Sequence, residues 1–315
     1  MTASAVELPR QELPVGHACL TGWAIHVPDG GEGHVPAADY ARELLGRKGL
    51  LYKEPATLMA LCAVHRALGL PPRTPRSLAE PDPRTAVVVS SNLGNAETVT
   101  KVARTARVAS VRDISLLDAP NASSNVIAST IAIWFRFGGP NLMVCSGATS
   151  GLDAVWLASL LLRTGRADRV VVVGVEPDDE ISVALRRRRG GRHAPARAGA
   201  ASLILEPAVV GAGTMPALGP IAFVSDREQL TFADHETLLV GCAELAGPRQ
   251  STVDVEEELG DLYGALGVVQ VATATALIAD TDSAAADTAT VVCGDDLDGW
   301  RSATICQPRP SGVDP

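Results

Sequence analysis

The sequence lacks long apolar runs, paired cysteines and an excess of positive charge. Each of these absences excludes a class of protein. No stretch approaches the roughly 20 uncharged apolar residues of a membrane span, so we predict no membrane partner. Residues 1–10 have neither a basic start nor a continuous apolar run, so they do not resemble a signal peptide. We therefore expect a cytoplasmic location.

Positive charge is in deficit. Lys and Arg number 27 against 36 Asp and Glu, and the formal net charge of −9 argues against a nucleic-acid partner. One basic run, residues 186–192, interrupts this balance. Its plainer interpretation is a solvated loop. The alternative is a docking patch for an acidic carrier protein, formed by Arg187, Arg188 and Arg189.

The cysteines are scattered without the C-x-x-C spacing of a zinc or redox site. Most of them stand in apolar runs, so we interpret them as buried, reduced thiols rather than metal ligands or disulfides. We predict no metal site. The six cysteines are Cys19, Cys62, Cys145, Cys242, Cys293 and Cys306.

What the sequence does contain is an alternation of apolar strands and helices. Its 315 residues, 46% of them hydrophobic, suffice for one large domain or two closely packed halves. Two helices, within residues 152–162 and 262–279, are apolar nearly all round and should be buried on all sides between sheets, as in a layered α/β architecture. The other pattern-based predictions are strands at 85–91, 142–145, 169–175 and 200–206, and helices at 56–68, 125–137 and 150–163.

A turn of small residues joins the strand at 142–145 to the following helix. Residues 139–155 read Gly-Pro-Asn-Leu-Met-Val-Cys-Ser-Gly-Ala-Thr-Ser-Gly-Leu-Asp-Ala-Val. A side chain in such a turn lies at a helix N-terminus, where backbone N–H groups and the helix macrodipole favour negative charge. The geometry suits a nucleophile, yet the central position is Ala148.

This segment resembles the nucleophile elbow of the β-ketoacyl synthases, the Claisen-condensing enzymes of fatty acid and polyketide assembly. Similarity to that family runs from about residue 85 to 206, and more loosely to 305. It includes a core strand with its Gly-rich turn (85–95) and a strand ending in Leu-Glu (198–206). The resemblance implies a thiolase-like five-layer αβαβα fold with two pseudo-duplicated halves, an N-terminal half at 1–207 and a shortened C-terminal half at 208–315.

The resemblance also implies that the family's chemistry is lost here. The family uses a cysteine and two histidines, the second of which follows a lysine. The matching positions hold Ala148, Glu244 and Asp261, with Glu256 at the position of the lysine. An enolate oxygen needs hydrogen-bond donors, and each donor removed costs about 3–4 kcal/mol of barrier, so carboxylates at these places oppose condensation. For Asp261 we predict a structural role, the N-cap of the following buried helix.

The expected function is that of a non-catalytic subunit similar to the chain-length factors of bacterial type II polyketide synthases. Such a subunit forms a heterodimer with an active ketosynthase, whose substrates arrive on phosphopantetheinyl acyl carrier protein. It needs no cofactor of its own. By position in the family, Leu93, Leu116, Leu117 and Asp118 should border the partner's acyl pocket. The expected interface comprises Ile127, Ile131, Trp134, Phe135, Met143 and Cys145.

Two other functions stay open. The chain could be a ketosynthase-like acyltransferase or malonyl decarboxylase that acts alone, through Cys145 or without covalent catalysis. We expect Cys145 to be inert, because burial on an apolar strand raises the pKa of a thiol. The chain could also be a stand-alone module that binds a carrier protein or an acyl group.

Overall fold

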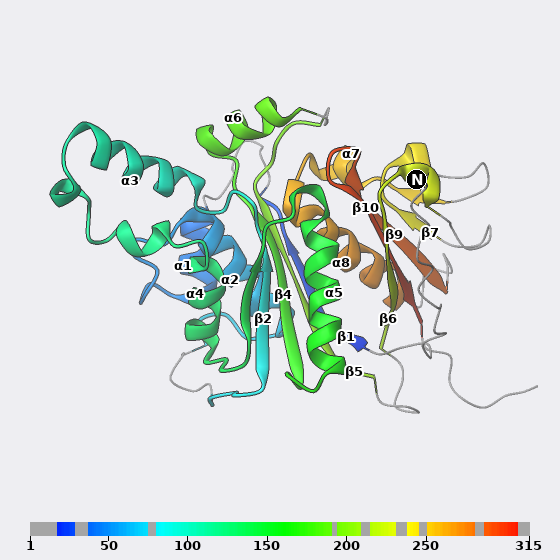
Figure 1. Cartoon of the computed structure of the whole chain (residues 1–315). Helices are drawn as coiled ribbons and strands as arrows, with labels where there is room; N and C mark the ends of the chain where they lie inside the picture. The colour runs from blue at the N-terminus through cyan, green and yellow to red at the C-terminus, as the bar shows by residue number, and fades with distance from the viewer. Residues whose placement is uncertain are drawn as a thin grey trace, which may run out of the picture.

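The computed structural model describes residues 18–28, 37–74, 80–190, 194–208, 215–230, 238–245, 251–280 and 287–307. Its strands form a ten-stranded sheet in the order β3-β2-β4-β5-β1-β6-β10-β9-β7-β8 (Figure 1). The first five strands are β1 (Ala18–His26), β2 (Thr85–Ser90), β3 (Asn141–Val144), β4 (Arg169–Glu176) and β5 (Gly199–Pro207). The last five are β6 (Ala217–Val224), β7 (Leu238–Val240), β8 (Thr252–Val253), β9 (Thr288–Asp295) and β10 (Gly299–Cys306).

The two sets of five strands have the same topology. In the first set, β2 is parallel to β3 and β4, and β5 is antiparallel to β4 and β1. In the second set, β7 is parallel to β8 and β9, and β10 is antiparallel to β9 and β6. The pseudo-duplication is therefore confirmed. The exact division at residue 207 remains a prediction, and it coincides with the last residue of β5.

Helices cover the outer face of the N-terminal strands. The apolar side chains of α2 and α4 pack with Val87, Val89 and Val173 in one hydrophobic core, as the predicted helix and strand periodicities require. The helices of the N-terminal half are α1 (Ala37–Leu45), α2 (Pro55–Ala67), α3 (Ala96–Val108), α4 (Val126–Phe135), α5 (Ser150–Arg163) and α6 (Glu180–Arg189). The C-terminal half contributes α7 (Val255–Leu259) and α8 (Leu266–Ala279).

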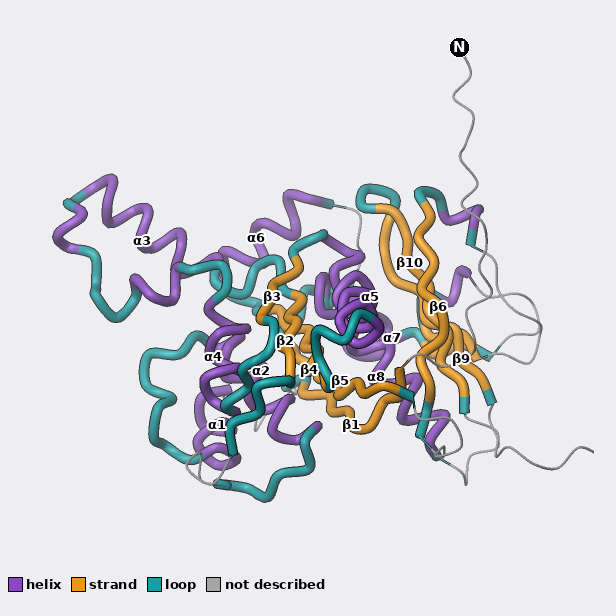
Figure 2. Tube along the Cα trace, turned by 60° about the horizontal axis from the view of Figure 1, so that its bottom comes forward, coloured by secondary structure: helices purple, strands orange, loops and turns teal. Residues whose placement is uncertain are grey.

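The middle layer consists of α5 and α8, which lie between the strands of the two halves (Figures 1 and 2). They approach closely because glycines face each other: a Cβ on Gly151 would lie 2.7 Å from Gly267 Cα. As predicted, α8 is buried nearly all round. The same expectation for α5 is wrong, because Trp156 is 39% exposed and packs edge-to-face on Phe223 of β6.

These elements confirm the thiolase-like α/β fold. Four of its five expected layers are formed by described residues. In the C-terminal half, the described parts of the connections from β6 to β7 and from β7 to β8 contain only single 3-10 turns, at Arg227–Gln229 and Ala243–Leu245. The equivalent N-terminal connections hold α1 and α2, and α3 and α4, respectively. None of the described helices has the length and apolar character needed to cross a membrane.

Candidate functional site

The elbow lies between the end of β3 and the start of α5. A 3-10 turn, Gly147–Thr149, leads into the helix, and Gly147 has a φ of 72°, in the region that favours glycine. Asp153 in the first turn of α5 braces the elbow by accepting hydrogen bonds from the Ser146 hydroxyl (2.5 Å) and the Thr149 hydroxyl (2.7 Å). Arg301 of β10 donates to the other Asp153 oxygen at 2.7 Å, so both halves of the chain hold the turn.

A buried carboxyl group supports the elbow from below. Glu176, at the end of β4, has no exposed surface and accepts the N–H groups of Asn92 (2.7 Å) and Leu93 (3.0 Å). Asn92 in turn bonds both the N–H and the carbonyl of Gly147. Burial raises the pKa of Glu176 to about 7, against the opposing effects of Arg186 and the two N–H donors. This carboxyl group connects the turn after β2 to the elbow.

The protein's own carboxylate occupies the centre of the elbow. The Ala148 N–H donates to Asp298 Oδ2 at 2.7 Å, and Ala148 itself is fully buried. Asp298 belongs to the turn between β9 and β10. An elbow N–H that would bind an external anion is therefore already bound to an internal one.

Arg189 of α6 holds this carboxylate in place. It donates to Asp298 at 2.5 Å and to both oxygens of Asp295 at 2.6 and 2.9 Å, and the Tyr263 ring lies 5.2 Å from its guanidinium carbon. Burial opposes the ionisation of Asp295, but the hydrogen bonds from Arg189 outweigh this and lower its pKa. The same bonds raise the pKa of Arg189, so Arg189 and Asp295 both stay charged near neutral pH.

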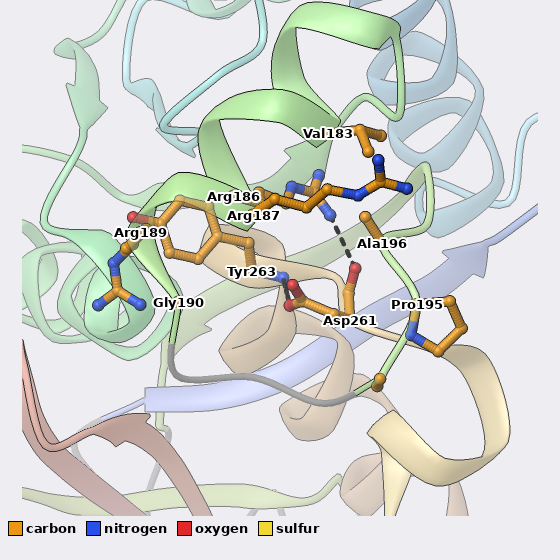
Figure 3. A pocket seen from close by; sticks show the side chains of 10 residues that line it. Val183, Arg186, Arg187, Arg189, Gly190, Pro195, Ala196, Asp261 and Tyr263 are labelled. Atoms are coloured by element: carbon orange, nitrogen blue, oxygen red, sulfur yellow. Dashed lines mark hydrogen bonds between the residues drawn. The ribbon is translucent and has the colours of Figure 1, made fainter.

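The basic run is not the solvated loop that the sequence predicted. Residues 186–189 form the last turn of α6, and Arg186 is buried because its guanidinium donates to the Pro177 and Asp261 carbonyls. Figure 3 shows Arg186, Arg187 and Arg189 around a cavity of about 550 Å³. Residues 191 and 192 lie outside the described residues. Of the proposed docking residues, Arg187 and Arg188 are exposed, whereas Arg189 is engaged with Asp295 and Asp298.

Asp261 has a capping role, although not the one predicted. Its Oδ1 accepts the Tyr263 N–H at 2.7 Å, at the 3-10 turn Tyr263–Ala265 that precedes α8, whereas the residue at the N-cap of α8 is Ala265. The sequence did not predict this turn, because the apolar pattern of the helix begins before it. Tyr263 has a φ of 44°, which is strained for a bulky residue and which the Asp261 contact helps to hold (Figure 3).

The other two family positions also carry carboxylates in the structure. Glu244 is exposed and lies 3.7 Å from Arg227, and Glu256 lies in α7. Both line a cavity of about 430 Å³, separate from Asp261, which borders the cavity beside the basic run. The structure therefore does not bring Ala148, Glu244 and Asp261 together around one cavity.

Most of the expected interface residues belong to the chain's own core. Ile127, Ile131, Trp134 and Phe135 are at most 7% exposed and pack with α2, so their side chains are not available to a partner. The exposed side of α4 instead carries Ile133, which is 70% exposed. Helical periodicity could have separated these two sides. Met143 is half-buried in β3, the last strand on its side of the sheet, and Cys145 is exposed.

The expected pocket residues are mostly exposed. Leu116 and Leu117 are 88% and 50% exposed in the segment after α3, which projects from the sheets in both views (Figures 1 and 2). Asp118 pairs with Lys101 at 2.6 Å. Leu93 is half-buried beside the elbow and bound to Glu176 through its N–H.

All six cysteines are free, as predicted, but only Cys62 and Cys293 are buried. Cys145 stands at the end of β3 rather than within it and is exposed, which corrects its expected burial. Its thiol donates to the Ser91 carbonyl at 3.0 Å. Its pKa is raised, as predicted, because partial burial and nearby Glu176 both disfavour the thiolate.

The fold and the elbow together define a thiolase-like protein. Comparison with known proteins identifies its family. The model of the β-ketoacyl synthase N-terminal domain matches residues 44–202, half of the chain. The chain belongs to the β-ketoacyl synthase family.

The relatives differ from the chain in length and detail. The chain is 30% identical over 179 residues to 3-oxoacyl-[acyl-carrier-protein] synthase 2 of Rhizobium meliloti (strain 1021), covering 56% of this chain but only 40% of that protein. Its fold is similar to that of the ishigamide ketosynthase/chain length factor, with a TM-score of 0.70 and 20% identity over 93% of this chain and 100% of that one. The fold is also similar to that of a type II polyketide synthase acyl-carrier protein in complex with its ketosynthase (AntDE:AntF). There the TM-score is 0.69 and the sequence identity 14%, over 93% of this chain and 100% of that one.

Proposed function

We propose that this chain is a non-catalytic, chain-length-factor-like subunit that pairs with an active ketosynthase and shapes its acyl pocket. The observation that carries the proposal is the hydrogen bond from the Ala148 N–H to Asp298. A methyl group cannot attack a thioester, and the N–H that would stabilise a developing oxyanion is bound to a carboxylate. The elbow therefore has a role in packing rather than in acyl transfer.

The charge near the elbow supports the same proposal. Arg189 is shared by two carboxylates, Asp295 and Asp298, so the group carries a net negative charge where condensation would generate an anion. Electrostatic stabilisation of that anion is the largest contribution to such catalysis. Here the local charge is negative, so it would destabilise the anion.

Exposed apolar side chains support a protein partner. They gather on α3 and the segment after it, which has few contacts with the body of the protein: Val99, Val108, Val111, Leu116 and Leu117 are 42–88% exposed. The free edge of β3 and the nearby exposed Ile133 offer a second apolar surface. Isolated apolar residues are ordinary on a surface, but a set along one projecting arm suits burial by a partner.

The partner that we propose is a ketosynthase, with acyl carrier protein delivering its substrates and no cofactor held by this chain. The folds of a ketosynthase/chain length factor and of a ketosynthase bound to its carrier protein support this choice. Arg187 and Arg188 remain the candidate carrier contacts, because both are exposed on α6.

The test is co-expression with a ketosynthase, followed by native mass spectrometry and product analysis. We expect a stable heterodimer and a product distribution that the ketosynthase alone does not give. Leu117→Ala should lengthen the products by enlarging the pocket floor, whereas Val108→Ala, exposed on α3, should not. Monomeric chains in the mixture, or identical products from both variants, would refute the proposal.

A further inference from the structure

The turn that joins β9 to β10 is organised by its own residues. The N–H groups of Leu297 and Asp298 both donate to Asp295 Oδ1 at 3.0 Å. At the base of the turn, Gly294 and Gly299 have φ values of 134° and 76°, in the region that favours glycine. The position of Asp298 is therefore fixed in part by the turn itself. We call the Asp298 carboxylate the plug.

The plug fills the space in front of the elbow backbone. Its Oδ2 accepts the Ala148 N–H at 2.7 Å, and a Cβ added to Gly147 would overlap the same carboxylate. The developing oxyanion of an acyl transfer to residue 148 would need that N–H group as a donor. The plug and such an oxyanion therefore exclude each other.

Arg189 fastens the plug from a third segment of the chain. Its guanidinium donates to Asp298 at 2.5 Å and to both oxygens of Asp295, so α6 is tied to the turn. The Arg189 and Asp298 side chains are 19% and 26% exposed, so water screens their contact only partly. Hydrogen bonds between charged groups are the stronger kind. The plug is thus held by two segments that lie outside the elbow.

The elbow behind the plug is assembled by other contacts. Asp153 and Asn92 hold its backbone through the hydrogen bonds described above, and neither set of bonds involves Asp298. Removal of the plug therefore leaves the Ala148 N–H at the start of α5, a helix of 14 residues. Negative charge is favoured at that position.

We propose that Asp298 is an internal plug that blocks acylation at residue 148, in addition to the missing nucleophile. With the plug removed and a thiol supplied, the elbow accepts an acyl group. The inference rests on the non-catalytic part of the proposed function and not on the pairing with a ketosynthase.

The experiment restores a nucleophile with Ala148→Cys, in a chain whose exposed thiol is removed by Cys145→Ala. The acyl donor is hexanoyl-N-acetylcysteamine, and intact mass follows acylation over time. The introduced thiolate attacks the thioester carbonyl carbon. A new S–C bond forms as the C–S bond of the donor breaks, and N-acetylcysteamine leaves with the proton that the introduced thiol gave up.

Adding Asp298→Ala should raise the acylation rate about tenfold or more. The N–H group becomes free for the oxyanion, and the introduced thiol loses a negative neighbour that raises its pKa. Asp296→Ala, which removes an exposed carboxylate from the same turn, is the matched control and should leave the rate unchanged. Equal rates with and without Asp298→Ala, or an equal gain from Asp296→Ala, would overturn the plug. Acylation of the unaltered chain would instead contradict the non-catalytic role on which the inference rests.

A second measurement decides the matter if the substitution at the buried position 148 prevents folding. In Asp298→Ala, sodium acetate should raise the midpoint of urea unfolding more than sodium chloride of equal ionic strength. Acetate can take the place of the lost carboxylate between the Ala148 N–H and Arg189. Asp296→Ala should show only the general effect of the salt. The same response in both variants would overturn the claim that the elbow keeps an anion site behind the plug.

Discussion

Replacing Asp298 by alanine should destabilise the protein measurably, because Asp298 satisfies a buried N–H group. Ala148 is fully buried, and its N–H would lose the acceptor that now lies at 2.7 Å. An orphaned buried donor costs about 1–3 kcal/mol. The lost contact with Arg189 adds about 1 kcal/mol at most, since Asp298 is 26% exposed and Asp295 still binds the guanidinium through both oxygens. We expect a total loss of about 3 kcal/mol.

The assay is urea unfolding followed by circular dichroism. Asp298→Asn keeps an oxygen for the Ala148 N–H and loses only the charge, so it should cost about 1 kcal/mol. Asp296→Ala is the matched control in the same turn. The Asp296 carboxylate is exposed and, among the described residues, accepts only a 3.3 Å bond from Trp300, so this substitution should change stability by less than about 0.5 kcal/mol. An Asp298→Ala protein as stable as the Asp296→Ala protein would refute the proposed role of Asp298.

Three further predictions follow from named contacts. Ile133→Asp should abolish co-purification with the ketosynthase while leaving the unfolding midpoint unchanged, because this side chain is 70% exposed; a retained complex would remove α4 from the interface. The stability that Glu176 contributes should be fully present below its ordinary pKa of 4.5 and lost as pH rises through about 7. Relative to Glu176→Gln, the loss should reach about 3 kcal/mol at pH 8, and a difference independent of pH would contradict it. Gly151→Ala should cost more than about 2 kcal/mol in urea unfolding, since its Cβ would meet the Gly267 backbone at 2.7 Å; a tolerated alanine would show that the helices can separate.

The regular elements were largely predictable because each is controlled by local pattern. The periodicity of residues 56–68 and the apolar run 85–91 predicted α2 and β2 to within a residue or two at each end. The 3-10 turn before α8 was missed, since residues 262–265 are as apolar as the helix that follows. The α6 ending in four arginines was missed because charge composition alone suggested a loop, whereas Arg186 is buried through contacts with distant carbonyls.

The site was predictable only where the chemistry lies within one segment. The elbow and the absence of a nucleophile at Ala148 could be inferred from residues 139–155. The bond from Ala148 to Asp298 joins positions 150 residues apart, and no local pattern indicates it. The same holds for Glu176, whose partners lie in the turn after β2, more than 80 residues earlier. Such contacts depend on the pairing of strands, which a local motif does not encode.

The most direct test of the central claim is intact-mass analysis after exposure to acyl- and malonyl-carrier protein. The chain is measured alone and in complex with a ketosynthase. We predict that the acyl group appears only on the ketosynthase and that this chain keeps its mass. Acylation of this chain that disappears in Cys145→Ala would make it an enzyme acting through its exposed thiol, and would contradict the non-catalytic role.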